Sequence, residues 1–259
     1  MVKLKPINLE IAGIGCQIFA PHMVYYYPWQ LILRRKYAPF LKEKVKPKLK
    51  IFFKSYGQID QLGTVFKTSR DLGHASFDLK KKEAEISPFF NFTFFDFFFR
   101  HLFGLVLPSF NGFMLHASSV AKDGRGYIFA GESGSGKSTI IKLSKSFQPL
   151  ADDSTIIRRV RKNFFVFASP FSEKEKIERK NSFFPLGGIY FLVKDKKNYL
   201  NKLSPNLVLE KLIVNVWPYL SNEFLKQAFP LLTQAAEKIP GYTLNFKKAD
   251  TFWEVIDGN

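Results

Sequence analysis

The sequence predicts an α/β protein with a mixed, largely antiparallel sheet and flanking helices. Strand-like apolar runs and runs with apolar residues at helical spacing follow one another along the chain. Two strand-like runs, residues 113–120 and 126–130, are separated by a tight turn that contains Lys122, Asp123 and Gly124. Because so short a connection joins antiparallel strands, we expect at least this part of the sheet to be antiparallel.

Length and composition allow a two-part organisation. The chain has 259 residues, of which 46% are hydrophobic, so it can bury a full core without a disulfide or a structural metal. We expect an amino-terminal α/β lobe, residues 1–108, packed on a second part, residues 109–259, where the motifs lie. The division follows the motifs, because the first part carries no pattern of chemical interest.

The amino-terminal lobe is expected to be a small sheet with helices. Its patterns predict strands at residues 7–20, 48–54, 63–68 and 74–79, a helix at 29–41 and an aromatic helix at 89–107. The aromatic helix is the best candidate for a membrane span, but Asp96, Arg100 and His101 interrupt it. Charged groups in hydrocarbon are costly, so we expect a buried helix and no membrane span.

The second part is expected to continue from the hairpin through further alternating elements. A helix is predicted at residues 137–146, a hairpin at 155–160 and 164–168, a mobile loop at 173–181, a buried strand at 188–193, a helix at 223–238 and a strand at 242–246. Ser204 and Pro205 have the residue types of a helix cap and first turn. The inner stripe of that helix is predicted to be Leu209, Leu212, Ile213 and Val216.

Net charge and cysteine content limit the expected cellular compartment and the expected binding partners. The formal net charge is +17, which would attract nucleotides, nucleic acid, anionic lipid or acidic peptides. The basic run Arg158, Arg159, Arg161 and Lys162 interleaves with apolar residues as one solvated strand face would, so nucleic acid is not the expected partner. A single cysteine, Cys16, and no signal-peptide order near the start predict a cytoplasmic protein. The number of subunits stays open.

A glycine-rich loop between the second hairpin strand and a helix is the main chemical signal. The run fits the pattern G-x-x-x-x-G-K-[ST] with Gly131, Glu132, Ser133, Gly134, Ser135, Gly136, Lys137 and Ser138, and Thr139 follows it. The glycines allow consecutive amides to point at one anion, and the start of the helix adds further amides. Lys137 can meet the β- and γ-phosphates of a nucleotide, and the Ser138 hydroxyl suits magnesium. We therefore expect residues Gly131 to Thr139 to bind a nucleotide triphosphate.

Asp152 and Asp153 can complete a phosphoryl-transfer site. They follow a short run, residues 149–151, that can return as a strand beside the loop. Side chains of adjacent residues diverge there, so one carboxylate can face the metal and the other an acceptor hydroxyl. Paired carboxylates also shift each other's proton affinity, which suits acid-base chemistry.

The motifs together resemble the catalytic domain of HPr kinase/phosphorylase. The resemblance lies in the run from Leu115 to Val120 that contains His116, in the run from Phe129 to Thr139, and in Leu150, Ala151, Asp152 and Asp153. It extends loosely from residue 113 to 192. The glycine-rich signature near a glutamate that marks the bifunctional enzymes has no counterpart, so the resemblance leaves phosphorylase activity open. The overall plan is more similar to stand-alone HPr-kinase-like proteins, which include lasso-peptide precursor kinases.

The resemblance implies the fold shared with phosphoenolpyruvate carboxykinase, a requirement for ATP and Mg²⁺, and transfer to a serine of a protein or peptide. By it, Lys137 grips the phosphates, Ser138 and Asp153 serve the metal, and Asp152 is the base. His116 supports the Asp152 carboxylate or the γ-phosphate. From the residues alone, the roles of the two aspartates are interchangeable.

Two other functions remain open from the sequence. One is an ATP-binding regulator that holds nucleic acid through its basic surface, and the other is a small-molecule kinase acting on free serine. The first would show steeply salt-dependent binding to DNA or RNA without transfer. The second would show competition by the free amino acid.

Overall fold

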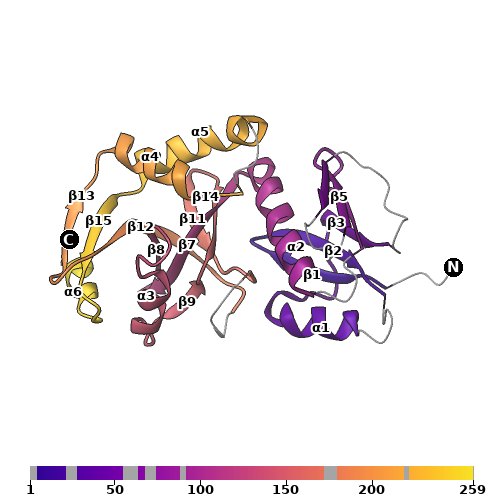
Figure 1. The fold of residues 1–259 in the computed structure, drawn as a ribbon, viewed down its shortest axis with the longest axis horizontal. Coiled ribbons are helices and arrows are strands. Elements are labelled where there is room, and N and C mark those ends of the chain that lie inside the picture. The colour runs from indigo at the N-terminus through magenta and orange to yellow at the C-terminus, as the bar shows by residue number, and fades with distance from the viewer. Residues whose placement is uncertain are drawn as a thin grey trace. The chain divides into compact units, whose positions relative to one another are not determined.

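The computed structural model describes residues 5–21, 28–54, 64–67, 74–87, 92–171, 180–218 and 222–258. The chain divides into two compact units, Met1–Val106 and Leu107–Asn259. Both are mixtures of helices and mostly antiparallel strands, so the predicted α/β class is correct at this level. Figure 1 shows the elements of each unit.

The first unit is built on a six-stranded sheet with strand order β1-β2-β3-β6-β5-β4. Its elements are β1 (Ile7–Ile11), β2 (Ile14–Phe19), α1 (Trp29–Lys36), η1 (Ala38–Phe40), β3 (Pro47–Phe53), β4 (Thr64–Lys67), β5 (His74–Asp78), β6 (Glu83–Ser87) and α2 (Phe92–Val106).

Aromatic side chains fill the core of this first unit. The Trp29 ring centroid lies 5.0 Å from that of Phe53 and 6.1 Å from that of Phe95. The Tyr37 ring meets Phe99 at 5.6 Å, and the Tyr37 hydroxyl donates to Asp96 at 2.7 Å. The aromatic helix is therefore a core helix, as predicted. Among the described residues, no helix is long and apolar enough to cross a membrane.

Two predictions for the first unit are wrong in detail. Residues 7–20 form a hairpin rather than one strand, because Ala12 and Gly13 both take left-handed φ values, 50° and 71°, and reverse the chain. The helix predicted to residue 41 ends at Lys36. Pro39 lacks an amide hydrogen and disfavours helical geometry in the preceding residue, so only a short 3₁₀ turn follows.

The second unit is built on a nine-stranded sheet whose main path is β11-β10-β7-β8-β12-β15-β13, with β9 and β14 also paired to β7. Its strands are β7 (Gly112–Lys122), β8 (Arg125–Ala130), β9 (Gln148–Ala151), β10 (Ser154–Val160), β11 (Asn163–Phe167), β12 (Phe183–Lys194), β13 (Tyr199–Lys202), β14 (Val216–Trp217) and β15 (Gly241–Phe246). Its helices are η2 (Leu107–Phe110), α3 (Lys137–Leu143), α4 (Pro205–Asn215), α5 (Asn222–Lys238) and α6 (Phe252–Asp257).

The predicted hairpin of the second unit is present as β7 and β8. Asp123 and Gly124 take left-handed φ values of 49° and 75° at its turn, and the strands pair antiparallel from Lys122–Arg125 to Ala117–Ala130. On its other side β8 pairs parallel with β12, and β12 pairs parallel with β15. Strand β8, which leads into the glycine-rich loop, thus has one antiparallel neighbour, β7, and one parallel neighbour, β12.

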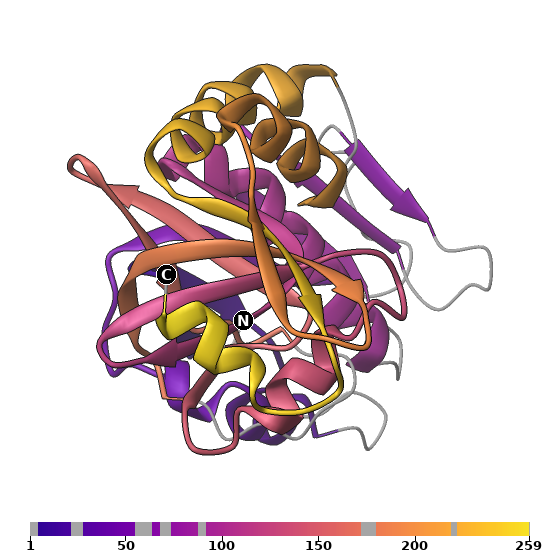
Figure 2. The ribbon, with the colours of Figure 1, turned by 90° about the vertical axis from the view of Figure 1, so that its left-hand side faces the viewer.

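Helices cover both faces of this second sheet (Figures 1 and 2). Ile140 and Ile141 of α3 and Phe252 and Trp253 of α6 share a buried cluster with Phe129, which fixes these helices on one face. On the other face α4 packs beside α5, and a Cβ at Gly241 would lie 2.4 Å from the Val208 side chain of α4. The glycine lets α4 approach the sheet closely.

Several predicted bounds in the second unit differ from the structure. Helix α3 ends at Leu143, three residues early, and β12 is longer than residues 188–193. Ser204 caps α4, and its hydroxyl accepts from the Leu207 amide at 3.5 Å, as expected. The buried stripe of α4 contains Val208 and Leu212, whereas Leu209 and Ile213 are only half-buried. Residues 173–179 of the predicted loop lie outside the described residues.

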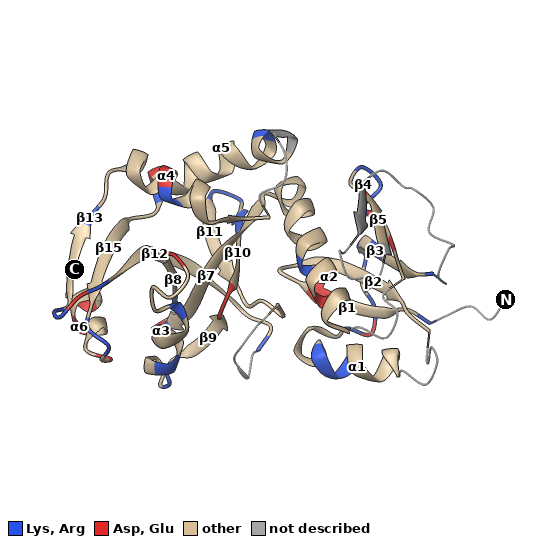
Figure 3. Ribbon diagram, viewed as in Figure 1, with Lys and Arg blue, Asp and Glu red and all other residues tan. Residues whose placement is uncertain are grey.

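Basic side chains are spread over many elements. Figure 3 shows Lys and Arg on helices, strands and turns of both units. Within the predicted basic run, Arg158 Nε donates to the Phe110 carbonyl at 2.9 Å and Arg159 donates to Gln234. These two arginines therefore have structural contacts on the strand β10 that carries them.

Candidate functional site

The glycine-rich loop connects the end of β8 to the start of α3. Gly134 and Gly136 have left-handed φ values of 81° and 116°. A Cβ at Gly136 would lie 2.5 Å from the ring of Phe246, which is part of the buried cluster beneath α3. Only glycine satisfies both the backbone geometry and the close approach at this position. The loop itself is exposed at Glu132, Ser133 and Gly134.

Lys137 is buried at the base of the loop. Its side chain is 8% exposed, and its ammonium group donates to the carbonyls of Gly131 at 2.7 Å and Glu132 at 3.1 Å. Its own carbonyl accepts from the Ser118 hydroxyl of β7 at 3.2 Å. These contacts hold the ammonium group under the first residues of the loop and tie the start of α3 to the sheet.

Two strands bring His116 and the aspartates together. Strand β10 pairs antiparallel with β7 so that Ser154 lies opposite His116, and the Ala117 amide donates to the Asp153 carbonyl at 3.1 Å. His116 Nδ1 then lies 3.1 Å from Asp153 Oδ1. Asp152, at the end of β9, is only 4% exposed. The histidine therefore contacts Asp153. Its role at the Asp152 carboxylate or at the γ-phosphate, which the resemblance implies, stays a prediction.

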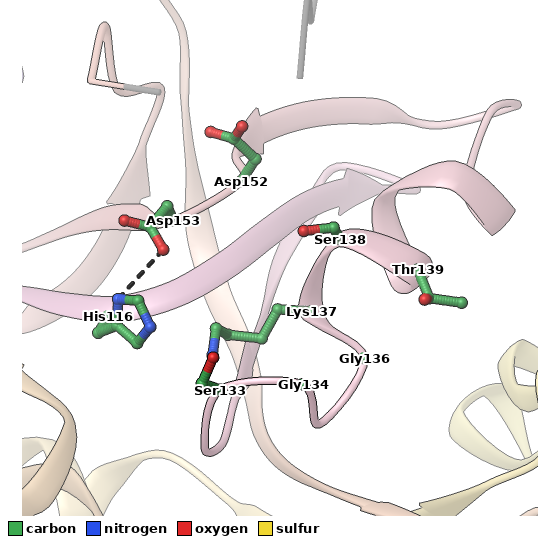
Figure 4. Close-up of a pocket in the computed structure, with 9 residues that line it drawn as sticks. All are labelled: His116, Ser133, Gly134, Gly136, Lys137, Ser138, Thr139, Asp152 and Asp153. Atoms are coloured by element: carbon green, nitrogen blue, oxygen red, sulfur yellow. Dashed lines mark ion pairs between the residues drawn. The ribbon is translucent and has the colours of Figure 1, made fainter. Parts of the chain in front are cut away.

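One cavity of about 320 Å³ joins these parts. It is lined by His116, Ser133, Gly134, Gly136, Lys137, Ser138, Thr139, Asp152 and Asp153. Figure 4 shows the two aspartates, Ser138 and Lys137 around one space, with the Asp153 carboxylate turned toward His116. Three segments that are far apart in the sequence thus place their polar groups at one site.

The remaining predicted residues of the loop lie at a neighbouring cavity. Gly131, Glu132 and Ser135 line a second space of about 730 Å³, which also touches His116, Ser133 and Gly134. All candidate residues named from the sequence therefore line one or both of these cavities. They lie where the parallel strands β8, β12 and β15 end, which is the usual place for ligands in open α/β sheets.

The side-chain groups that line the first cavity are hydroxyl and carboxylate oxygens, the Lys137 ammonium group and the His116 imidazole. The Ser138 hydroxyl and the carboxylates of Asp152 and Asp153 are among its oxygen donors, and such donors are the ones magnesium prefers. Within the described ranges, no group of three or more His, Cys, Asp or Glu residues is arranged to hold a metal ion.

Two supporting residues are not evident from the sequence. Ser118 binds the Lys137 carbonyl, and Phe246 packs under Gly136 from a strand more than a hundred residues away. The serine lies in the strand predicted to precede the loop, and its inward register is the only signal that could have singled it out. No local pattern links Phe246 to the loop.

Together, fold and site define an α/β protein in which a glycine-rich strand–loop–helix segment faces a pair of carboxylates. The family model described as SynChlorMet cassette protein ScmC matches residues 105–258, which is more than half of the chain. The protein therefore belongs to the ScmC family. No curated protein matches the chain.

Among solved structures, the chain is similar to the HPr(Ser) kinase/phosphatase from Coxiella burnetii. The match has 10% sequence identity and a TM-score of 0.35, and it covers 56% of this chain and 94% of that one. A similarity of this size supports no inference about the site.

Proposed function

We propose that the protein is an ATP- and Mg²⁺-dependent serine kinase that transfers the γ-phosphoryl group to a serine of a protein or peptide. The observation that carries the proposal is the single cavity lined by the glycine-rich loop, Lys137, Ser138 and both aspartates. Phosphoryl transfer needs an anion cradle, metal ligands on a second side and a group that orients the acceptor. In this proposal residues 109–259 are the catalytic core, of the type shared by HPr kinase and phosphoenolpyruvate carboxykinase.

The loop and Lys137 would bind the triphosphate. Amides between Gly131 and Thr139 supply the donors, and the exposed backbone at Ser133 and Gly134 leaves room for phosphate oxygens. The ammonium group of Lys137 would exchange its carbonyl partners at Gly131 and Glu132 for phosphate oxygens. Because α3 has seven residues, we ascribe the binding mainly to the loop amides and the lysine rather than to the helix dipole.

Ser138 and Asp153 would hold the magnesium ion. Magnesium usually takes few protein ligands and completes its shell with water and phosphate oxygens, so one hydroxyl and one carboxylate suffice. His116 would orient the Asp153 carboxylate from behind, through the contact at 3.1 Å. When bound, magnesium would supply positive charge against the charge that develops on the transferring group, and Ser138 and Asp153 would be the residues that hold it.

Asp152 would take the proton of the acceptor hydroxyl. The serine oxygen forms the new bond to the γ-phosphorus, and the bond from that phosphorus to the bridging oxygen breaks, so that its electron pair leaves with ADP. Asp152 is next to Asp153, the proposed metal ligand, and lines the same cavity as Lys137. One cavity therefore holds both the proposed base and the lysine that would bind the phosphates. Lys137 would hold the phosphates throughout.

The decisive experiment measures transfer directly. Purified protein is incubated with ATP, Mg²⁺ and an arrayed library of serine peptides, and mass spectrometry detects the gain of a phosphate. We expect Lys137→Ala and Asp152→Asn each to lower the rate by a factor on the order of a hundred or more. Lys145→Ala, which removes the same charge from an exposed position just beyond α3, should leave the rate within about twofold.

Other outcomes would replace the proposal. Full activity in both site variants would contradict the assigned roles. Binding of ATP without any transfer, together with steeply salt-dependent binding to DNA or RNA, would identify a regulator instead. Transfer to free serine, with peptides inert, would identify a small-molecule kinase.

A further inference from the structure

The second cavity, of about 730 Å³, is larger than the one that contains the aspartates. One wall is the loop segment Gly131–Ser135, and another is the end of β12, Phe191–Lys194. Val214 and its neighbours on α4 form a third wall, and Thr243 of β15 contributes from the sheet. All of these elements belong to the second unit.

The contacts of Lys137 show which end of the loop faces this second cavity. The ammonium group of such a lysine meets the β- and γ-phosphates. Here it lies at the carbonyls of Gly131 and Glu132, and both residues line the second cavity. Thr139, at the opposite end of the loop, lines only the first cavity. The transferred end of a bound triphosphate would therefore point toward the second cavity.

His116 marks the junction between the two spaces. It lines both cavities and contacts Asp153 at 3.1 Å. A hydroxyl that enters from the second cavity would thus reach the paired carboxylates at the point where the γ-phosphate lies. A nucleoside would leave the loop at the other end, near Thr139.

We infer that the second cavity binds the acceptor, and that the acceptor is an extended peptide segment with apolar residues next to its serine. The inference rests on the proposed kinase function and deepens it. It assigns the β12–α4 side of the loop to the acceptor, whereas the aspartate side holds the metal and the base.

Apolar side chains on the β12 and α4 walls are the reason for the expected sequence preference, and charged side chains of Glu132, Lys194, Glu210 and Lys211 line the rest of the cavity. Phe191 is buried on the α4 side of β12, with Lys211 Nζ 5.5 Å from its ring centroid, whereas the Leu192 side chain belongs to the buried cluster beneath α3. Val193 is 44% exposed and Val214 is 79% exposed. An apolar side chain next to the acceptor serine would cover these valines and gain free energy in proportion to the area removed from water.

The end of β12 can also pair with a peptide backbone. The pairing of β8 with β12 stops at Ala130 and Phe191, where β8 turns into the loop, whereas β15 accompanies β12 to Lys194. Val193 and Lys194 thus extend past the end of β8 on the loop side, whereas at Leu192 the loop lies close to the carbonyl, since a Cβ at Gly131 would lie 3.4 Å from that oxygen. An extended segment added at this edge would form main-chain hydrogen bonds and place alternate side chains into the cavity. Free serine has no such backbone and would leave most of the cavity to water.

The test combines two variants in the second cavity, called the groove variants, with matched controls outside it. Val214→Asp and Val193→Asp place a carboxylate on the α4 and β12 walls, and both positions are exposed, so the fold should tolerate them. Leu207→Asp on the same helix, 46% exposed, and Val160→Asp on β10, 40% exposed, add the same charge outside the cavity. The probes are the arrayed serine-peptide library and Mg²⁺-ATP.

We expect both groove variants to raise the KM for peptide about tenfold or more, because the carboxylate desolvates poorly against apolar side chains. The dissociation constant of ATP, measured by calorimetry without peptide, should stay within about twofold, and the two controls should resemble the unchanged protein. The library should favour peptides with apolar residues beside the serine.

Distinct results would overturn the inference. If peptide transfer occurs but the groove variants behave like the controls, the acceptor binds elsewhere while the kinase proposal stands. If the variants at Val214 and Val193 raise the dissociation constant of ATP instead, the second cavity holds the nucleoside. If the unchanged protein neither binds ATP nor transfers phosphate, the kinase proposal itself fails, and the acceptor assignment falls with it.

Discussion

The two units contain the same local arrangement, a hairpin whose second strand leads toward a helix, with different connections. In the first unit β1 and β2 pair antiparallel, β2 pairs parallel with β3, and α1 follows. In the second unit β7 and β8 pair antiparallel, β8 pairs parallel with β12, and α3 follows.

The connection between strand and helix is what differs. Between Phe19 and Trp29 the sequence has neither a glycine nor a lysine, and Pro28 precedes the helix with an ordinary φ of −82°. Between Ala130 and Lys137 there are three glycines, and Lys137 itself returns to the loop. The same strand arrangement can thus serve packing in one unit and a candidate site in the other, because the loop residues decide the chemistry.

Replacing the residue that precedes each helix should give the largest contrast. Gly136→Ala sets a Cβ 2.5 Å from the Phe246 ring and forces a left-handed φ on alanine, so we expect a loss of about 4 kcal/mol in the free energy of unfolding. Pro28→Ala in the first unit should cost less than about 1 kcal/mol, because its φ is accessible to any residue. Urea unfolding of both variants measures the difference. Equal losses would show that the two connections are under the same constraint.

The sequence predicts the elements of this comparison unevenly. The hairpin of the second unit is predictable because Asp123 and Gly124 form a standard two-residue turn. The hairpin of the first unit is missed, because Ala12 gives no sign that it adopts a left-handed φ. Strand β6 is also missed, since its glutamates read as exposed, although Glu85 is nearly buried and its carboxylate lies 2.9 Å from Lys54 Nζ.

For the site, the sequence identifies residue types but not their partners. The loop pattern and the pair of aspartates are local, and both contribute residues to the first cavity. The contact of His116 with Asp153 depends on the register between β7 and β10, which spacing alone does not fix. The second cavity needs Val214 and Thr243, which come from distant elements, so no motif could reveal it.

Acid should weaken the first unit selectively. Burial, and then the neighbouring Arg100 charge, lower the pKa of His101 to about 4 from an ordinary value of 6.5. A lowered histidine pKa means that the unfolded chain binds the proton more readily, so stability is present above pH 6.5 and is lost as pH falls toward 4. We expect about 2 kcal/mol to be lost between pH 7 and pH 5.

Hydrogen exchange of the α2 amides at both pH values measures this loss, and His101→Leu should reduce it. The second unit has His116 as its one histidine, with a side chain that is 41% exposed, so its core strands should respond less. Equal acid sensitivity of α2 and β8, or an undiminished response in His101→Leu, would contradict the role of His101.

The smallest expected effect comes from replacing one glycine in each connection, which separates a loss of stability from a loss of ATP binding. Gly13 in the first hairpin and Gly134 in the loop have similar left-handed φ values, 71° and 81°, and a Cβ at Gly134 would meet nothing within 4 Å. Alanine at Gly134 should therefore cost only about 1 kcal/mol of stability, from backbone strain alone, and Gly13, which is exposed and has a similar φ, should bear a similar cost. Gly134→Ala should also weaken ATP binding severalfold, because the strained loop relaxes away from the geometry that aims its amides, whereas Gly13→Ala should leave it unchanged. Calorimetric titration with Mg²⁺-ATP, alongside urea unfolding, distinguishes the two, and an equal change in ATP affinity would mean that stability rather than loop geometry controls binding.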